Sequence, residues 1–318
     1  MTRAEDIPLR VVAVETLNDT LLRFTLARAD GGELPTGAAG AHIMLAVQDG
    51  HRTHRNAYSL TGHPDDRRCY RIIVRRVAES RGGSAYLHAH VRVGDVLHAG
   101  WPVNLFPLAS LARRHLLVAR GIGLTPMLSF AAVLSARGAP FELHQMCRAA
   151  DEAAFHALLA PYVDAGIAQV HVDPAPAFDL PALLARQPLG THLYMCGPRR
   201  MMDDVTACAR ALGWPRHSPH QESFGDHSGG APFVVRTART GLTLPVAADQ
   251  TILEALEDAG LSPACLCRGG VCGECRTTVL EGVPDHRDDV LDASERIGNR
   301  DMMICVSRAR TPELLIDL

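Results

Sequence analysis

The first hundred residues alternate hydrophobic and polar positions with the period of two that is typical of a half-buried β-strand. Strand-like segments fall at 9–17, 21–27 and 70–77, and turns rich in Gly, Asp and Pro separate them. Residues 8–106 contain almost no convincing helical periodicity. The pattern therefore predicts an antiparallel β-barrel over residues 1–107.

After Pro107 the pattern changes to alternating strands and helices. A buried strand at 115–119 leads through a glycine turn to a helix at 126–138 and a second strand at 141–146, which is a βαβ unit. Further helices are predicted at 151–160, after Asp179 and at 199–212, and further strands at 168–172 and 191–195. We expect an α/β domain with a parallel sheet over residues 108–225.

Residues 226–232 are small, polar and turn-forming, as an exposed interdomain linker is. The remaining segment, 233–318, is expected to form a third domain. Its predicted elements are a helix at 251–260 and strands at 232–237, 242–246, 276–282 and 302–308.

Composition narrows the class of protein. A length of 318 residues predicts two or three domains, and a formal net charge of −3 is unlike that of a nucleic-acid-binding protein. The N-terminus lacks the apolar core of a secretion signal, and no later apolar run approaches the roughly 18 residues of a membrane span. We expect a cytoplasmic protein with neither nucleic acid nor membrane as a partner.

Four cysteines carry the most specific signal in the sequence. Cys267, Cys272 and Cys275 have the spacing C-x4-C-x2-C, and Cys305 follows in a predicted strand, which matches the plant-type [2Fe-2S] pattern. Glycines at 269, 270 and 273 would allow the backbone to approach the cluster closely. A four-cysteine zinc site is the alternative, although such sites usually use two C-x2-C pairs.

The other cysteines outside this spacing are interpreted as buried apolar residues. They are Cys69, Cys147, Cys208 and Cys265, the last of which lies only two residues before Cys267.

Two weaker patterns lie upstream. Residues 121–126, Gly-Ile-Gly-Leu-Thr-Pro, join a predicted strand to a helix, where glycines can admit a pyrophosphate to free N–H groups. Residues 58–59, 74–76 and the loop 80–84 would supply an aromatic neighbour, cations and N–H donors for a phosphorylated flavin. Each piece of the flavin pattern taken alone is more often a turn, a solvated face or core packing, whereas the glycine turn at 121–126 is as often functional as structural.

Together these features resemble the phthalate dioxygenase reductase family, which includes vanillate demethylase reductases. The resemblance is carried by the cysteine loop, by GVPDHRDDVLDASER at 282–296 and by the C-terminal CVSRARTPELLIDL, and its order of motifs extends over nearly the whole chain. It implies a flavin-binding barrel, a nucleotide-binding α/β domain and a β-grasp ferredoxin domain.

The resemblance also assigns residues to the three cofactors. For NAD it implies Gly121, Gly123, Cys196, Gly197 and Pro198, and it places Cys196 and Thr125 at the reacting centre. For FMN it implies Arg55, Tyr58, Ser59, Val74, Arg76, Gly82, Gly83, Ser84, Thr125 and Phe224. For the cluster it implies Cys267, Cys272, Cys275 and Cys305.

This chain departs from the family pattern at two places. Arg120 stands where the family commonly has glycine, and its cation could meet a phosphate. The flavin motif reads Arg55-Asn56-Ala57-Tyr58-Ser59, one residue longer than Arg-x-Tyr-Ser, so Arg55 would face away from Tyr58 in a regular strand. Either a bulge redirects Arg55 or Asn56 occupies its place.

The implied function is an NADH-dependent reductase. A nicotinamide gives up two electrons as a hydride whereas a [2Fe-2S] cluster accepts one, so a flavin between them has to hold the second. In the family the electrons pass to the Rieske centre of a separate oxygenase. Arg148 leaves a preference for NADPH open. The alternatives are a free-standing diaphorase or flavin reductase and an iron-sulfur redox sensor.

Overall fold

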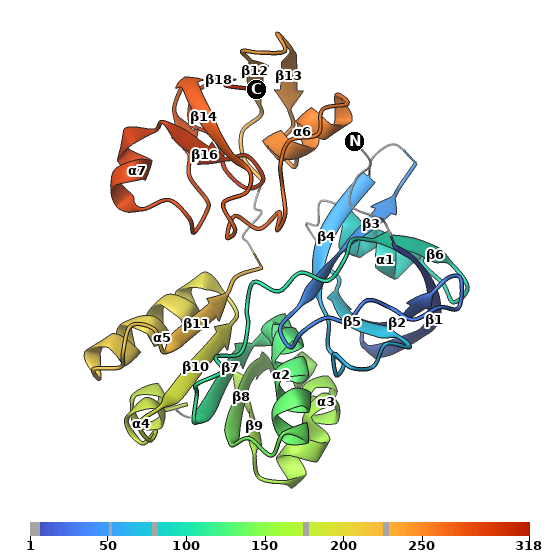
Figure 1. The fold of residues 1–318 in the computed structure, drawn as a ribbon, viewed down its shortest axis with the longest axis vertical. Helices are drawn as coiled ribbons and strands as arrows, with labels where there is room; N and C mark the ends of the chain where they lie inside the picture. The colour runs from blue at the N-terminus through green and yellow to red at the C-terminus, as the bar shows by residue number, and fades with distance from the viewer. Residues whose placement is uncertain (1–6, 51–52, 78–81, 174–177, 225–228) are drawn as a thin grey trace. The chain divides into compact units, whose positions relative to one another are not determined.

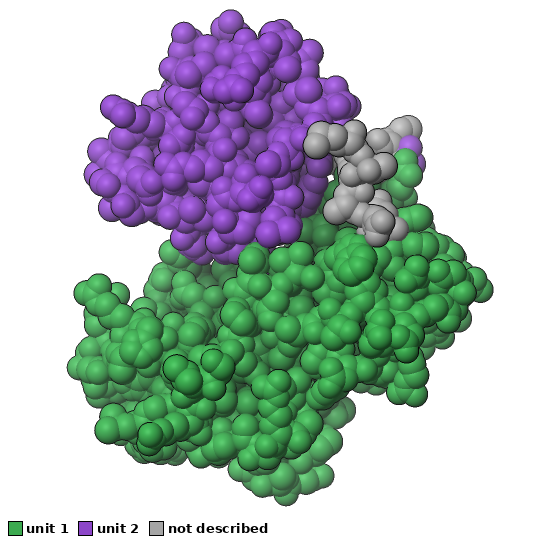
Figure 2. All heavy atoms as spheres, in the orientation of Figure 1, with its two compact units in different colours: residues 1–49, 53–223 green, residues 50–52, 224–318 purple. Residues whose placement is uncertain are grey.

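The computed structural model describes residues 7–50, 53–77, 82–173, 178–224 and 229–318. The chain divides into two compact units, one of residues 1–49 and 53–223 and one of residues 50–52 and 224–318 (Figure 2). The boundaries expected at 107, 225 and 232 stay predictions, and part of the expected linker lies outside the described residues. Within the described ranges no helix is long and apolar enough to cross a membrane.

A six-stranded antiparallel sheet forms the first part of unit 1, as the alternating pattern predicted (Figure 1). Its strands, in the order β4-β3-β6-β1-β2-β5, are β1 (Ile7–Asn18), β2 (Leu21–Arg28), β3 (His42–Gln48), β4 (Thr53–Ser59), β5 (Tyr70–Arg75) and β6 (Val96–Ala99). Alternate residues such as Leu9 and Val11 are fully buried, so one face of the sheet makes the core.

The expectation of almost no helix in this region was wrong at one place. Helix α1 (Gly83–His90) packs Leu87 into the core of the antiparallel sheet. Only three of its eight residues are buried, and two of these are Gly83 and Ser84. Because the buried face contains a single large apolar residue, the segment has no hydrophobic periodicity that sequence analysis could detect.

The second part of unit 1 is a parallel sheet in the order β11-β10-β7-β8-β9, which confirms the predicted α/β arrangement. The strands are β7 (Arg114–Arg120), β8 (Phe141–Arg148), β9 (Ala168–Asp173), β10 (Thr191–Cys196) and β11 (Pro219–Glu222). The helices are α2 (Leu124–Ala136), α3 (Glu152–Asp164), α4 (Leu180–Ala185) and α5 (Arg199–Ala211). Strand β11 was not predicted, because a four-residue polar strand carries no hydrophobic signal.

The two sheets of unit 1 share a buried core and a polar connection. Leu21, Ile73 and Phe106 from the first part pack in one cluster with residues of α2 and α3. The buried Asp151 carboxylate accepts hydrogen bonds from Asn18 Nδ2 and Arg75 Nη2, both at 2.9 Å. These contacts hold the ends of β1 and β5 against the start of α3.

Unit 2 is built on a mixed five-stranded sheet in the order β13-β12-β18-β14-β16. Its strands are β12 (Phe233–Thr237), β13 (Thr243–Val246), β14 (Arg276–Glu281), β16 (Asp301–Met303) and β18 (Glu313–Ile316), and β15 (Pro284–Asp285) pairs with β17 (Arg308–Ala309). Helices α6 (Ile252–Asp258) and α7 (Ala293–Gly298) both begin with a capping box. The C-terminal strand β18 joins the centre of the sheet by pairing in parallel with β12.

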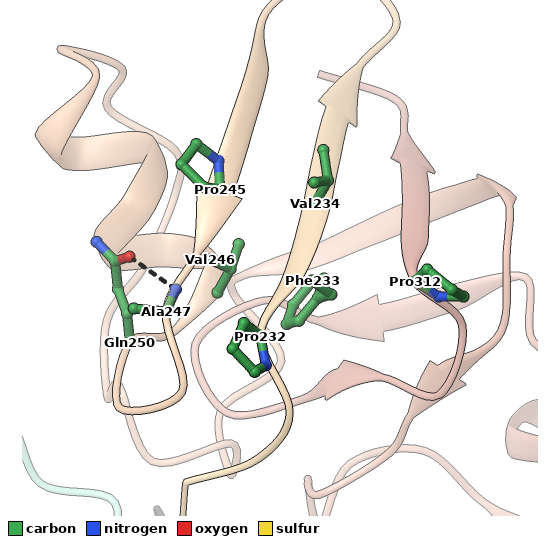
Figure 3. Close-up of a pocket in the computed structure, with 8 residues that line it drawn as sticks. All are labelled: Pro232, Phe233, Val234, Pro245, Val246, Ala247, Gln250 and Pro312. Carbon is green, nitrogen blue, oxygen red and sulfur yellow. Dashed lines mark hydrogen bonds between the residues drawn. The ribbon is translucent and has the colours of Figure 1, made fainter.

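A shallow apolar pocket of about 440 Å³ lies beside β12 and β13 (Figure 3). Its lining includes Phe233, whose ring centre lies 5.1 Å from the Arg308 guanidinium carbon. Arg308 also donates hydrogen bonds to the carbonyls of Ala231 at 3.1 Å and Ala247 at 3.0 Å. The buried Arg308 side chain therefore links the segment before β12 to the segment after β13.

Candidate functional site

The cysteine loop lies between α6 and β14 in unit 2. Cys267, Cys275 and Cys305 are buried, whereas Cys272 is partly exposed. The sequence predicted that Cys305 lies in a strand. In the structure it lies in the turn that directly follows β16. The turn brings Cys305 back to the loop because β16 pairs antiparallel with β14, the strand that begins after Cys275.

The thiols of the loop and of the turn lie close to one another in pairs. Cys305 is within hydrogen-bonding reach of the side chains of Cys267 and Cys275, and Cys267 is within reach of Cys272. Hydrogen bonding from Cys305 and from the backbone N–H groups of Val271 and Gly269 holds the pKa of Cys267 well below its usual value, although burial opposes the shift. The pKa of Cys275 is lowered as well, whereas those of Cys272 and Cys305 are raised, so the thiolate form that iron requires is favoured at two of the four positions.

The backbone of the loop is tightly curved. Arg268, with φ of 51°, and Gly270, with φ of 71°, both have left-handed conformations. A Cβ on Gly270 would lie 2.6 Å from Val306 Cγ2 and 3.1 Å from the Cα of Asp288, so this position requires glycine. Gly273 also has a positive φ, whereas Gly269 does not, so only two of the three expected glycines are needed for their backbone conformation.

The segment that carries the family motif at 282–296 supports this loop. The N–H of Asp289 donates to the Gly270 carbonyl at 2.9 Å. The buried Asp288 carboxylate accepts hydrogen bonds from the N–H groups of Val290 at 3.1 Å and Leu291 at 2.8 Å. The motif therefore stabilises the cysteine loop through hydrogen bonds to its backbone and within the motif itself.

The four cysteines that were interpreted as buried apolar residues have different environments. Cys147 is buried, as expected, and Cys69 and Cys208 are partly buried. The interpretation of Cys265 as an apolar filler was incomplete, because its thiol is within hydrogen-bonding reach of the side chains of Cys275 and Cys305.

In unit 1 the two nucleotide motifs meet at the carboxyl edge of the parallel sheet. Residues Gly121–Gly123 form a single 3-10 turn, η1, between β7 and α2. A Cβ on Gly123 would lie 2.1 Å from the carbonyl oxygen of Cys196, so only glycine permits η1 to approach the end of β10 this closely. Gly121 has φ of 56° and open space on its Cβ side.

Thr125 and Cys196 are both buried at this edge. The Thr125 hydroxyl donates to the Ile122 carbonyl at 3.0 Å, across the start of α2. Cys196 is completely buried, and desolvation raises its pKa well above the usual value. Gly197 and Pro198 follow directly and lead into α5.

Glu222 is a candidate residue that sequence analysis missed. It lies opposite Cys196 in the parallel pairing of β10 and β11, and its Oε2 atom is buried with no hydrogen-bond partner in the described part of the chain. Burial raises the pKa of Glu222 to about 8. Buried polar atoms normally have a hydrogen-bond partner. The carboxyl group of Glu222 is therefore a candidate for hydrogen bonding to a ligand at this edge. A lone glutamate in a polar tetrapeptide gives no sequence signal.

Arg120 forms an ion pair with Asp173, across the carboxyl ends of β7 and β9. The sequence suggested that the Arg120 cation could meet a phosphate. In the structure the Asp173 carboxylate would compete with a phosphate for this cation. Arg148 is exposed at the end of β8.

The flavin motif in β4 has an unbroken register. β3 and β4 pair without a bulge from His42↔Ser59 to Gln48↔Thr53. Arg55 consequently lies on the opposite face of the strand from Tyr58, and Asn56 lies on the same face. A Cβ on Gly83 would lie 2.7 Å from Asn56 Oδ1, so the glycine loop packs on the Asn56 face.

The other expected flavin residues are more widely spread, and Ser59, like Arg55, lies on the face of β4 opposite Tyr58. Burial raises the pKa of Tyr58, and the Ser59 hydroxyl is buried without a hydrogen-bond partner among the described residues. Val74 is buried, and its carbonyl lies 3.0 Å from His88 Nε2 of α1. Arg76 is exposed at the end of β5. The orphaned Ser59 hydroxyl and the glycine turn fit a bound polar group such as a flavin.

The remaining flavin positions are placed as follows. Gly82, with φ of 115°, precedes α1, and Gly83 and Ser84 form its first residues. Residues 78–81, which include the start of the expected loop, lie outside the described residues. Phe224 is 41% exposed and falls in unit 2.

Two family models match the chain. Residues 235–310 match the 2Fe-2S iron-sulfur cluster binding domain, and residues 104–218 match the N-terminal domain of dimethylamine monooxygenase subunit DmmA-like proteins. The first match decides between the two interpretations of the cysteines, in favour of [2Fe-2S] over zinc.

Whole-length relatives give the same picture. The chain is 43% identical over 312 residues to the heme-dependent oxidative N-demethylase beta subunit of Ectopseudomonas mendocina, covering 98% of this chain and 99% of that one. It is 40% identical over 314 residues to the carnitine monooxygenase reductase subunit of Escherichia coli, covering 98% of each. The solved structure of phthalate dioxygenase reductase, described as modular for electron transfer from pyridine nucleotides to [2Fe-2S], matches with a TM-score of 0.88, 35% identity and 98% coverage of each chain.

We predict that Gly123→Ala raises the KM for NADH by at least about tenfold, because the new Cβ has to displace η1 from the Cys196 carbonyl. Steady-state NADH oxidation with ferricyanide as acceptor measures the effect. Gly298→Ala is the control, since a Cβ there would meet nothing within 4 Å. Identical kinetics for the two variants would contradict the prediction.

We predict that Glu222→Gln removes a pH dependence of stability. In the folded chain the pKa of Glu222 is about 8 against its ordinary value of 4.5, so its protonated form stabilises the fold below that lower value, and the contribution is lost as the pH rises through about 8. Between about pH 5 and about pH 9 the wild-type melting temperature should fall further than that of Glu222→Gln. The exposed Glu152→Gln variant should follow the wild type, and parallel pH curves for all three proteins would show that Glu222 is not responsible.

Proposed function

Because the chain belongs to the family of oxygenase reductase subunits that includes phthalate dioxygenase reductase, we propose that it passes electrons from NADH through FMN and a [2Fe-2S] cluster to a separate oxygenase. The observation that carries the proposal is the pairwise proximity of Cys267, Cys272, Cys275 and Cys305 in a segment that matches a 2Fe-2S domain, in a chain that also contains a parallel and an antiparallel sheet. When bound, the cofactors supply the conversion of a hydride into single electrons.

The residues of unit 1 act by positioning. Gly123 lets η1 reach the end of β10, and the open Cβ side of Gly121 leaves room for the pyrophosphate near the N–H groups that begin α2. Cys196 and Glu222 keep the neighbouring strand ends free of charge, because burial favours their protonated forms. Uncharged side chains at the ends of β10 and β11 favour close contact with the nicotinamide ring.

Binding of FMN is assigned to the β4 face that carries Asn56 and Tyr58, together with the turn at 82–84 and with Ser59, which ends the strand. We propose that Asn56 takes the place of the family's arginine, because the unbroken β3–β4 register turns Arg55 to the other face. Ser59 is the hydroxyl left without a partner among the described residues, and it is available to the flavin.

The acceptor is proposed to be the Rieske centre of a ring dioxygenase or of an O- or N-demethylating monooxygenase, as the family resemblance implies. A haem oxygenase is the second candidate, because one relative is named as a subunit of a heme-dependent oxidative N-demethylase. Purified oxygenases of both classes can be tested by following reduction of their own absorbance bands under anaerobic NADH.

We predict that Cys272→Ser abolishes NADH-dependent reduction of cytochrome c while ferricyanide reduction persists, because only the former requires the cluster. In the wild type, anaerobic stopped-flow with NADH should bleach the flavin absorbance before that of the cluster. A wild-type cluster that stays oxidised would overturn the proposed path. If Cys272→Ser leaves both activities intact, the diaphorase alternative is supported.

The surface at the cluster is the proposed docking site for the oxygenase. Cys272 is its partly exposed ligand, and Leu266 and Val271 beside it are 44% and 37% exposed. Arg268 is not available for docking, because its side chain is largely buried in an ion pair with Glu257. Glu274, next to Cys275, is exposed.

We predict that Glu274→Arg slows reduction of the partner oxygenase several-fold at low salt and less at high salt, while NADH-to-ferricyanide turnover stays normal. Glu281→Arg is the matched control, because Glu281 is also exposed but ends β14, whose six residues span about 17 Å. Equal effects of the two charge reversals would place docking elsewhere.

A further inference from the structure

The strand order of the parallel sheet in unit 1 sets the direction in which a dinucleotide can lie along its carboxyl edge. From β7 the chain builds β8 and β9 on one side and then returns to add β10 and β11 on the other, so the order reverses between β7 and β10. Ligands of open α/β sheets bind outside the carboxyl ends of the strands at this reversal. With the pyrophosphate at η1 and the nicotinamide at the ends of β10 and β11, as proposed above, the adenosine half extends over β8 and β9.

Three charged side chains mark the adenosine end of this edge. Arg120 ends β7, Arg148 ends β8 and Asp173 ends β9. Arg148 and Asp173 are partners in the β8–β9 register, so they are direct neighbours across the strand pair. Two cations and one carboxylate leave this end of the edge with a net positive charge, which suits an anionic group.

The ion pair between Arg120 and Asp173 crosses the end of β8. Since β8 separates β7 from β9, the Arg120 side chain has to extend away from η1, towards the adenosine end, to reach this carboxylate. The two side chains remain 38% and 35% exposed. Ion pairs this open to water contribute little free energy, so an anion that binds Arg120 more strongly can displace Asp173.

NADPH would bring such an anion to this place, because it differs from NADH by a phosphate on the 2′ oxygen of the adenosine ribose. A phosphate monoester carries a charge of about −1.5 to −2 at pH 7, and its oxygens are strong hydrogen-bond acceptors. A guanidinium can bind it through two parallel hydrogen bonds. The exposed Arg148 adds a second cation. In NADH the 2′ hydroxyl can instead donate a hydrogen bond to a carboxylate such as Asp173.

We propose that Arg120 and Asp173 form a reversible ion pair that admits both nicotinamide nucleotides. The inference rests on the proposed function and extends its electron donor from NADH to NADPH. With NADH, Asp173 accepts the 2′ hydroxyl and keeps its ion pair; with NADPH, Arg120 leaves Asp173 for the 2′ phosphate. The kcat/KM for NADPH should lie within about tenfold of that for NADH, because attraction by Arg120 and repulsion by Asp173 act on the same phosphate.

Two substitutions in the full-length chain break the same ion pair but should change the nucleotide selectivity in opposite directions. Arg120→Gln removes the cation and should lower kcat/KM for NADPH about tenfold, while that for NADH changes less than about twofold. Asp173→Asn removes the repelling carboxylate and should raise kcat/KM for NADPH several-fold while lowering that for NADH. Steady-state oxidation of each nucleotide with ferricyanide as acceptor measures both constants.

Binding measured without turnover separates this role from a structural one. In isothermal titration calorimetry Arg120→Gln should weaken NADP⁺ about tenfold and leave NAD⁺ nearly unchanged. Arg137→Gln is the matched control, because this exposed arginine follows the last residue of α2, about 20 Å along the helix from η1, and should not alter either affinity.

Two results would overturn the inference. One is a wild-type kcat/KM for NADPH more than about tenfold below that for NADH. The other is an NADPH-to-NADH ratio that moves in the same direction in Arg120→Gln and Asp173→Asn, as a merely structural ion pair would cause. A wild type that neither oxidises nor binds either nucleotide would instead overturn the proposed function, and the inference with it.

Discussion

Thiols from two distant stretches of sequence have to meet within a few ångströms, and much of unit 2 is arranged around this requirement. The antiparallel pairing of β14 with β16 returns the chain from Cys275 to Cys305. Gly270 can lie against Asp288 and Val306 only because it has no side chain. The segment at 286–291 then holds the loop from behind through its own backbone hydrogen bonds. The loop itself contains little regular structure, so its shape depends on these neighbours.

A similar close approach governs the nucleotide edge of unit 1. Two parallel strands end side by side, and the turn after β7 touches the last residue of β10 through Gly123. The same edge collects buried protonated groups at Cys196 and Glu222 and an ion pair between Arg120 and Asp173. Parallel strands present their carboxyl ends on one side, which explains why residues far apart in sequence gather there.

Charge in both sites is controlled more by pairing and burial than by residue type. From the sequence Arg268 would be expected to be a surface cation. In the structure its side chain is largely buried and forms an ion pair with Glu257. Glu222 looks like a surface carboxylate, yet its pKa is raised to about 8 because water is excluded. The cysteine loop exposes two large apolar side chains, Leu266 and Val271, together with the carboxylate of Glu274. Such a surface suits a transient protein partner better than a polyanion.

Signals that lie within a few consecutive residues could be interpreted from the sequence alone. The alternation of β1 and β2, the βαβ order after Pro107 and the C-x4-C-x2-C spacing are of this kind, because each depends on a local period. Helix α1, strand β11 and the turn at Cys305 could not be predicted, since they owe their conformation to the sheets they pack on or pair with. The choice between Arg55 and Asn56, the partner of Arg268 and the approach of Cys265 to Cys275 likewise depended on strand register and packing between distant segments. Tertiary structure decided them because a side chain's neighbours across a sheet or a loop are not encoded in its neighbours along the chain.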